Sequence, residues 1–118
     1  MRLQLKYRTG PRVLKERPAS IDELFTRTGE LLVECVASAP GGEVKAPFRN
    51  YDAIEVVHGR IELSIADGRF GSKTRGGIDV RRDGSAEAFL GRTSRSVIES
   101  RPGENLVDAL RRELLAAT

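Results

Sequence analysis

The sequence contains few of the residue types on which metal and thiol chemistry depend. Its 118 residues include one cysteine, one histidine and no tryptophan. A structural zinc site needs about four Cys or His ligands, and a redox pair needs two cysteines. Cys35 and His58 alone supply neither, so we expect no metal and no cofactor. Cys35 lies in the apolar run LLVECVA, and we interpret it as a small core residue.

Long hydrophobic runs are missing as well. No stretch approaches the roughly 18 apolar residues of a membrane-spanning helix. The first ten residues, MRLQLKYRTG, contain no apolar segment of the kind that a signal peptide needs. We therefore expect no membrane association and a cytoplasmic location. We also expect a single domain over residues 1–118 with a modest aliphatic core, because 39% of the residues are hydrophobic.

Catalytic motifs are absent from the printed sequence. It has no Gly-x-Ser-x-Gly elbow, no phosphate-binding P-loop and no metal-binding His pair. The residues needed for common chemistry are therefore missing, while charged segments and loops are plentiful. This contrast favours a non-catalytic binding or accessory module over an enzyme.

Alternation of apolar and polar residues predicts an α+β fold that is mostly antiparallel sheet or a small β-barrel of six to eight strands. The clearest strand is at residues 2–7, RLQLKY. Further predicted strands cover residues 30–37, 78–82, 86–90 and 94–100, and residues 13–17 and 44–48 are candidates for a short return strand and a short edge strand. Two helices complete the prediction. A short one of about two turns begins with Ser20 as its cap and ends at Gly29, and a longer one covers residues 104–117.

The centre of the chain predicts a tight hairpin over residues 52–68. Apolar residues alternate with polar ones on both sides of His58-Gly59, and Gly59 tolerates a positive φ. A two-residue turn there places Glu55 opposite Glu62 on the outer face. The two carboxylates with His58 form an alternative polar site for acid–base chemistry or weak metal binding.

A second hairpin is predicted around Asp83-Gly84. A three-residue connection with Gly84 at positive φ sets Val80 opposite Ala88 and Arg81 opposite Glu87. That register keeps one face apolar and pairs two opposite charges across the strands.

Charge is distributed unevenly along the chain, although the net charge is only +3. Residues 1–17 carry six cations and one anion, residues 18–68 carry four and nine, and residues 69–103 carry eight and four. We expect the glycine-rich stretch 67–77 to be a mobile loop that contributes to binding. The candidate residues for binding a nucleic-acid backbone or a protein partner, including a second copy, are Arg69, Lys73, Arg75, Arg81, Arg82, Arg92 and Arg95.

A family resemblance supports a competing interpretation. Residues 40–59, PGGEVKAPFRNYDAIEVVHG, resemble the first motif of cupins, where a Gly precedes His-x-His, then a Glu, then a Gly at a hairpin. Phe48 and Asn50 stand where the metal-binding histidines would be, and either Asp52 or Glu55 fills the acidic position. The resemblance implies a metal-free barrel that binds a small ligand inside. Its pocket would lie behind Ile54, Leu63 and Ile65.

One structural criterion separates these alternatives. A filled interior with the arginines on one continuous face favours nucleic acid. A lined cavity favours a small ligand, and an exposed apolar strand edge favours self-association.

Overall fold

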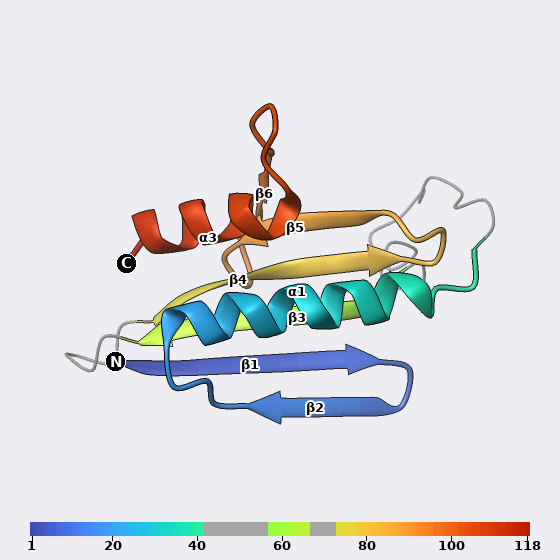
Figure 1. The fold of residues 1–118 in the computed structure, drawn as a ribbon, viewed down its shortest axis with the longest axis horizontal. Helices are drawn as coiled ribbons and strands as arrows, with labels where there is room; N and C mark the ends of the chain where they lie inside the picture. Colours follow the sequence, from blue (N-terminus) through green and yellow to red (C-terminus); the bar gives the residue numbers. More distant parts are fainter. Residues whose placement is uncertain (42–56, 67–72) are drawn as a thin grey trace.

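The computed structural model of the protein describes residues 1–41, 57–66 and 73–118. Within these ranges the chain forms a six-stranded antiparallel sheet in the order β2-β1-β3-β4-β5-β6 (Figure 1). The strands are β1 (Arg2–Thr9), β2 (Arg12–Glu16), β3 (Val57–Ala66), β4 (Lys73–Arg81), β5 (Ala86–Leu90) and β6 (Ser96–Ile98). The helices are α1 (Ile21–Ala37) and α3 (Leu106–Ala116). This arrangement confirms the predicted α+β class.

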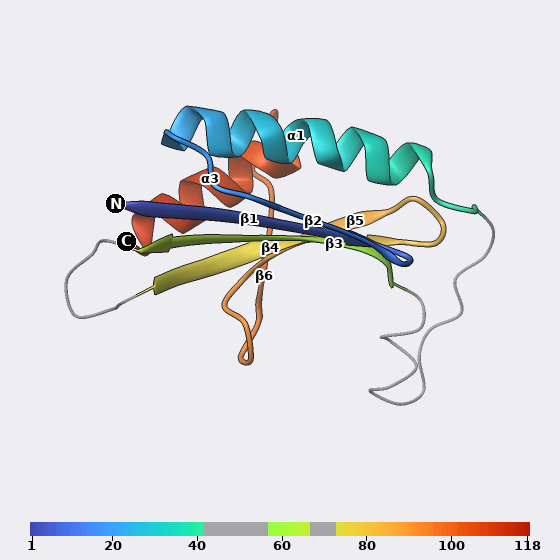
Figure 2. The ribbon, with the colours of Figure 1, turned by 90° about the horizontal axis from the view of Figure 1, so that it is seen from below.

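Both helices lie on the same face of the sheet, and the other face carries no described helix (Figure 2). The covered face is built from the apolar half of each alternating strand. In β1, Leu3, Leu5 and Tyr7 are buried. In the adjacent β3, Ile61, Leu63 and Ile65 are buried opposite them. Leu24, Leu31, Leu110 and Leu114 of the helices complete this filled core.

The described strands form an open sheet, with β2 and β6 at its two ends, and not a barrel. The predicted cupin-like barrel is therefore wrong for this part of the chain. Leu63 and Ile65 belong to the solid core between sheet and helices, while Ile54 and the other residues of the cupin-like motif up to Val56 lie outside the described ranges, apart from Pro40 and Gly41. None of the helices in the described residues is long and apolar enough to cross a bilayer.

Helix α1 begins where the sequence predicts, but it is twice as long as expected. Ser20 caps it by accepting a hydrogen bond from the Glu23 amide at 3.1 Å. The predicted end at Gly29 and the predicted strand 30–37 are wrong, because the helix continues to Ala37. Its buried residues, Leu24, Phe25, Thr28, Leu31 and Cys35, recur with the spacing of one helical face. That stripe passes through Gly29 without interruption.

The predicted turn at His58-Gly59 is also wrong. Both residues belong to β3, which pairs with β1 on one side and with β4 on the other. A Cβ atom on Gly59 would overlap the Cys35 sulfur of α1. Gly59 is therefore a site of close helix–sheet approach and not a turn residue. The other half of the predicted hairpin, residues 52–56, lies outside the described residues.

The hairpin between β4 and β5 has the predicted three-residue connection. Gly84 has φ of 87°, as predicted, and Arg81 N donates to Ser85 O at 2.8 Å. The connecting residues are 82–84, because the Asp83 carboxylate accepts from the Ser85 amide at 2.9 Å and fixes the turn there.

That turn shifts the strand register by two residues from the predicted one. Val80 lies opposite Ala86, and Ala88 lies opposite Ile78. A shift of two keeps every side chain on its predicted face. Arg81 and Glu87 consequently form a diagonal ion pair at 3.0 Å instead of lying directly opposite each other.

The glycine-rich stretch is partly a strand. Residues 73–77 belong to β4, so the predicted loop over 67–77 is wrong for that half, and residues 67–72 lie outside the described ranges. A Cβ atom on Gly76 would lie 3.2 Å from Leu114 of α3. Gly76 therefore lets the helix approach the sheet closely.

Candidate nucleic-acid interface

The uncovered face of the sheet is formed by the polar half of each alternating strand. In β1 the residues Arg2, Gln4, Lys6 and Arg8 point there, because Leu3, Leu5 and Tyr7 point to the helices. The cross-strand register continues this face through β3 and β4. The cations that these three strands contribute to it are Arg2, Lys6, Arg8, Arg60, Lys73, Arg75 and Arg81. The same strands contribute two carboxylates to it, Glu62 and Asp79, so the face carries a net positive charge.

The helical layer carries the opposite charge. Helix α1 contains four carboxylates and one arginine. Its arginine, Arg27, is held by Glu16 at 2.9 Å and by Glu30 at 3.6 Å. Two further arginines, Arg12 and Arg111, form ion pairs with carboxylates of α1. In the described part of the chain, α1 is therefore acidic, whereas α3 carries two carboxylates and two arginines.

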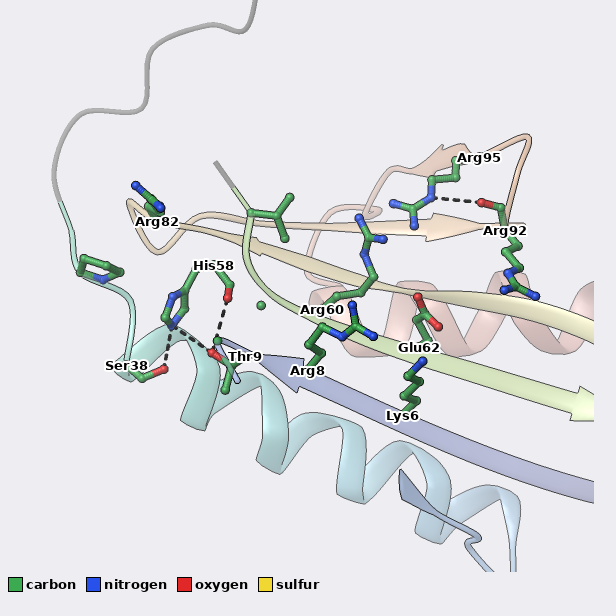
Figure 3. Close-up of a pocket in the computed structure, with 14 residues that line it drawn as sticks. Lys6, Arg8, Thr9, Ser38, His58, Arg60, Glu62, Arg82, Arg92 and Arg95 are labelled. Atoms are coloured by element: carbon green, nitrogen blue, oxygen red, sulfur yellow. Dashed lines mark hydrogen bonds between the residues drawn. The ribbon is translucent and has the colours of Figure 1, made fainter. Parts of the chain in front are cut away.

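A cleft of about 860 Å³ opens on the basic face, and Figure 3 shows the side chains around it. Its floor comes from β1 and β3, and its wall from the connection between β5 and β6, which stands out from the sheet in Figure 2. Of the residues that the structure describes, six cations and one carboxylate, Glu62, line it together with His58. The cations are Lys6, Arg8, Arg60, Arg82, Arg92 and Arg95.

A smaller hollow of about 200 Å³ extends the cleft towards Arg75. The two hollows share Lys6, Glu62, Arg92 and Arg95 as lining residues. They therefore form one groove across the sheet, which we call the basic groove.

Among the described residues, ion pairs involve only two of the cations that line the cleft. Asp79 binds Arg60 at 2.6 Å and Arg95 at 2.9 Å, so these two guanidinium groups are held in place. Four other cations that line the cleft form no ion pair with a described residue: Lys6, Arg8, Arg82 and Arg92. An arrangement of this kind attracts a ligand with several negative charges.

Arg95 occupies a distinctive position in the wall. Its guanidinium lies over the Phe89 ring, with 4.1 Å between the guanidinium carbon and the ring centroid. Phe89 is only 4% exposed, although it points to the uncovered face. Its ring covers Gly77, where a Cβ atom would lie 2.9 Å from the ring. The absence of a side chain at Gly77 therefore leaves room for the Phe89 ring.

The structure brings most of the predicted binding residues to this face. Arg82, Arg92 and Arg95 line the cleft, and Arg75 lines its extension. Lys73 lies further along β4. Arg81 shares the face but is paired with Glu87, and Arg69 lies outside the described residues.

Three cations of the groove were not among the predicted site residues: Lys6, Arg8 and Arg60. The signal for Lys6 and Arg8 is present in the sequence, because strict alternation in RLQLKYR places them on one face of a strand. Their proximity to Arg92 and Arg95 depends on the pairing of β1 with β3, which joins residues about 55 positions apart.

In the alternative polar site, the predicted position of Glu62 opposite Glu55 is wrong, because two other strands flank Glu62. Glu62 lies opposite Lys6 of β1 and Gly77 of β4, and Glu55 lies outside the described residues. His58 instead contacts the Ser38 hydroxyl at 2.9 Å and the Thr9 hydroxyl at 3.4 Å (Figure 3). No group of three or more His, Cys, Asp or Glu side chains suited to a metal occurs in the described part of the chain.

Cys35 lies in the core, as predicted, and not in the groove. It is fully buried between α1 and the sheet, and burial raises the pKa of its thiol. A raised pKa disfavours the reactive thiolate. Cys35 is therefore a packing residue.

Comparisons with known proteins add no relative. No protein-family model, no curated protein and no solved structure matches the chain. The chemistry of the basic groove is therefore the basis for a proposed function.

Proposed function

We propose that this protein is a non-catalytic module that binds a nucleic-acid backbone on the uncovered face of its sheet. The observation that carries the proposal is the basic groove, where six cations and one carboxylate are the charged residues among the described ones that line the cleft. The core behind the sheet is filled. By the criterion stated above, a filled interior and a shared basic face favour nucleic acid. A cytoplasmic location remains part of this proposal.

Phosphate chemistry suits the groove. Guanidinium groups donate paired hydrogen bonds to phosphate oxygens, and each neutralised phosphate releases a condensed counterion. Cations of β1 lie in the floor of the cleft, and cations of the β5–β6 connection lie in its wall. A chain of phosphates between them would therefore contact both the floor and the wall.

Self-association through a strand edge is less favoured. Val13 of β2 is 48% exposed and Val97 of β6 is 59% exposed, so each end of the sheet has one exposed apolar residue. However, the edge strand β2 carries Arg12 and Lys15, and charged side chains on an edge oppose pairing with another strand. Strand β6 is only three residues long. Neither edge offers the continuous apolar surface that a stable dimer needs.

The test compares two variants that remove equal charge from opposite sides of the molecule. Lys6→Gln with Arg8→Gln removes two cations from the groove, whereas Arg12→Gln with Arg111→Gln removes two from the helical side. Binding of a fluorescent mixed-sequence oligonucleotide is measured by anisotropy at several salt concentrations. We expect the groove variant to bind more weakly and its salt slope to fall by roughly 0.7 per lost contact on a single strand.

The helical-side variant should bind nearly as tightly as the wild type. Equal losses in both variants would show a nonspecific response to net charge and would contradict the proposed face. Absence of binding by the wild-type protein, together with dimer formation in light scattering, would favour the protein-facing alternative.

A further inference from the structure

Arg95 presents a guanidinium group that is fixed before any ligand binds. One face of the group lies over the Phe89 ring at 4.1 Å. Its Nη1 donates to Asp79 Oδ2 at 2.9 Å, and its Nε donates to the Arg92 carbonyl at 3.4 Å. An arginine side chain normally loses considerable rotamer entropy when it is ordered. These three contacts already restrict Arg95 in the described structure.

The support beneath Arg95 is itself rigid. Phe89 is 4% exposed and packs over Gly77, with no room for a larger residue beneath the ring. Asp79 is held in turn by a second arginine, Arg60, at 2.6 Å. Phe89 therefore packs on Gly77, and the guanidinium of Arg95 packs on Phe89 as the outermost group. We call this stack of three residues the platform.

The outer side of this platform faces the basic groove. Arg95 lines both hollows, and its side chain is 30% exposed. Lys6 and Arg92 line the same two hollows. A planar group resting on Arg95 would therefore have cations available beside it for flanking phosphates.

Nucleobases are planar groups that stack on arginine guanidinium planes as well as on aromatic rings. Inside a duplex, both faces of each base are covered by its neighbours, so only an unpaired base offers a free face. The β5–β6 connection, which carries Arg92 and Arg95, projects from the sheet (Figure 2) and forms the wall of the groove. A groove with a wall and a stacking surface suits a single strand better than a rigid duplex.

We propose that the basic groove binds single-stranded nucleic acid, with one unpaired base stacked on the guanidinium of Arg95. This inference depends on the proposed function and extends it from phosphate contact to a choice of strand form. Lys6 and Arg92 hold phosphates beside the stacked base. Phe89 and Asp79 are positioning residues, because they act through Arg95.

The test uses three ligands of equal length: a mixed-sequence single strand, the same strand with abasic sites throughout, and the duplex. The abasic strand keeps every phosphate and loses every base. With the wild-type protein we expect it to bind roughly tenfold more weakly than the natural strand, as stacking of about one base implies. We expect the duplex to bind more weakly than the single strand at the same salt concentration.

A variant then locates the stacking surface. Arg95→Lys retains the positive charge but removes the planar guanidinium. We expect the preference for the natural over the abasic strand to shrink towards one, while the salt slope stays near the wild-type value. A 2-aminopurine base in the strand should be quenched on binding to the wild type and less quenched on binding to the variant. Circular dichroism confirms that the variant is folded.

The wild-type comparison stands even if the variant fails to fold. Equal affinity for natural and abasic strands, or equal affinity for single strand and duplex, overturns this inference and leaves backbone binding intact. Failure of all three ligands to bind at about 50 mM salt overturns the proposed function as well.

Discussion

Gly59 shows how one residue can have two interpretations that only packing distinguishes. In the sequence it follows His58 between two alternating segments, as a turn glycine would. In the structure it lies inside β3, beneath Cys35 of α1. A Cβ atom there would overlap the Cys35 sulfur and lie 3.1 Å from the Arg8 carbonyl oxygen. The residues around Gly59 in the sequence do not reveal these contacts, because Cys35 and Arg8 are about 24 and 51 residues away in the chain.

Gly59→Ala tests this close approach. We expect the free energy of unfolding to fall by about 1–3 kcal/mol, as for other overpacked core sites. Adding Cys35→Ala should recover part of the loss, because it removes the sulfur that the new methyl group would meet. Urea denaturation measures both changes. An unchanged midpoint for Gly59→Ala would show that the helix does not lie as close as described.

Gly29→Ala is the matched control, because a side chain at Gly29 meets no neighbouring atom whereas one at Gly59 does. Gly29 lies inside α1, and a Cβ atom there would meet nothing within 4 Å. The substitution should stabilise the protein by about 1 kcal/mol, because alanine favours a helix over glycine. A loss of stability in the same urea measurement would argue against a continuous α1.

Burial of the Tyr7 hydroxyl should make the stability of the protein depend on pH in the alkaline range. The oxygen is buried and has no hydrogen-bond partner among the described residues, and burial raises the Tyr7 pKa from 10.0 to about 12. The unfolded chain therefore ionises first, and the wild type should lose stability as the pH rises from 10 towards 12. Tyr7→Phe should be at least as stable at pH 7 and should lose less at high pH. Chemical denaturation at several pH values gives the comparison, and parallel curves for the two proteins would contradict it.

At the scale of elements, the sequence predicts β1 and α3 from clear patterns, and it predicts the β4–β5 hairpin with the correct faces but with a register two residues away. The eight residues ELLVECVA fit two structures, because their apolar positions suit a strand buried on both faces as well as a helix. The longer stripe from Leu24 through Thr28 and Leu31 to Cys35 favours the helix. The predicted helix ended at Gly29, because glycine more often ends a helix than lies within one.

The entry to α3 depends on one carboxylate. Glu104 accepts hydrogen bonds from Arg112 and from the Arg101 amide, all at 3.0 Å. The Arg112 guanidinium, followed by that amide, lowers the pKa of Glu104 from 4.5 to about 2. A lowered folded-state pKa contributes stability above pH 4.5 that is lost as the pH falls through 2.

Glu104→Gln should therefore lower the melting temperature at pH 7, and the difference from the wild type should shrink between pH 4.5 and pH 2. Thermal unfolding followed by circular dichroism measures both proteins across this range. Glu30→Gln, which changes a carboxylate with a 60% exposed side chain, is the control. A difference for Glu104→Gln that stays constant with pH would show that the carboxylate charge does not hold α3 in place.

At the scale of the whole molecule, the sequence reveals that charge is distributed unevenly along the chain. It does not reveal which charged side chains lie close together in the fold. Strand alternation assigns each cation to one face or the other. Assembly of the basic groove also requires the strand order β2-β1-β3-β4-β5-β6. That order places residues 6–8 beside residues 60–62 and brings the β5–β6 connection over them. The sequence therefore predicts which segments are basic, but it does not predict that these segments form one groove.

The central claim, that the uncovered sheet face binds a nucleic-acid backbone, is tested most directly by salt. Anisotropy of a labelled mixed-sequence single strand is measured with the wild-type protein from about 50 to 200 mM salt. We expect affinity to fall steeply, with a log–log slope of about −3 if four cations of the cleft each neutralise one phosphate. A slope near zero, or no binding at the lowest salt concentration, would contradict the account.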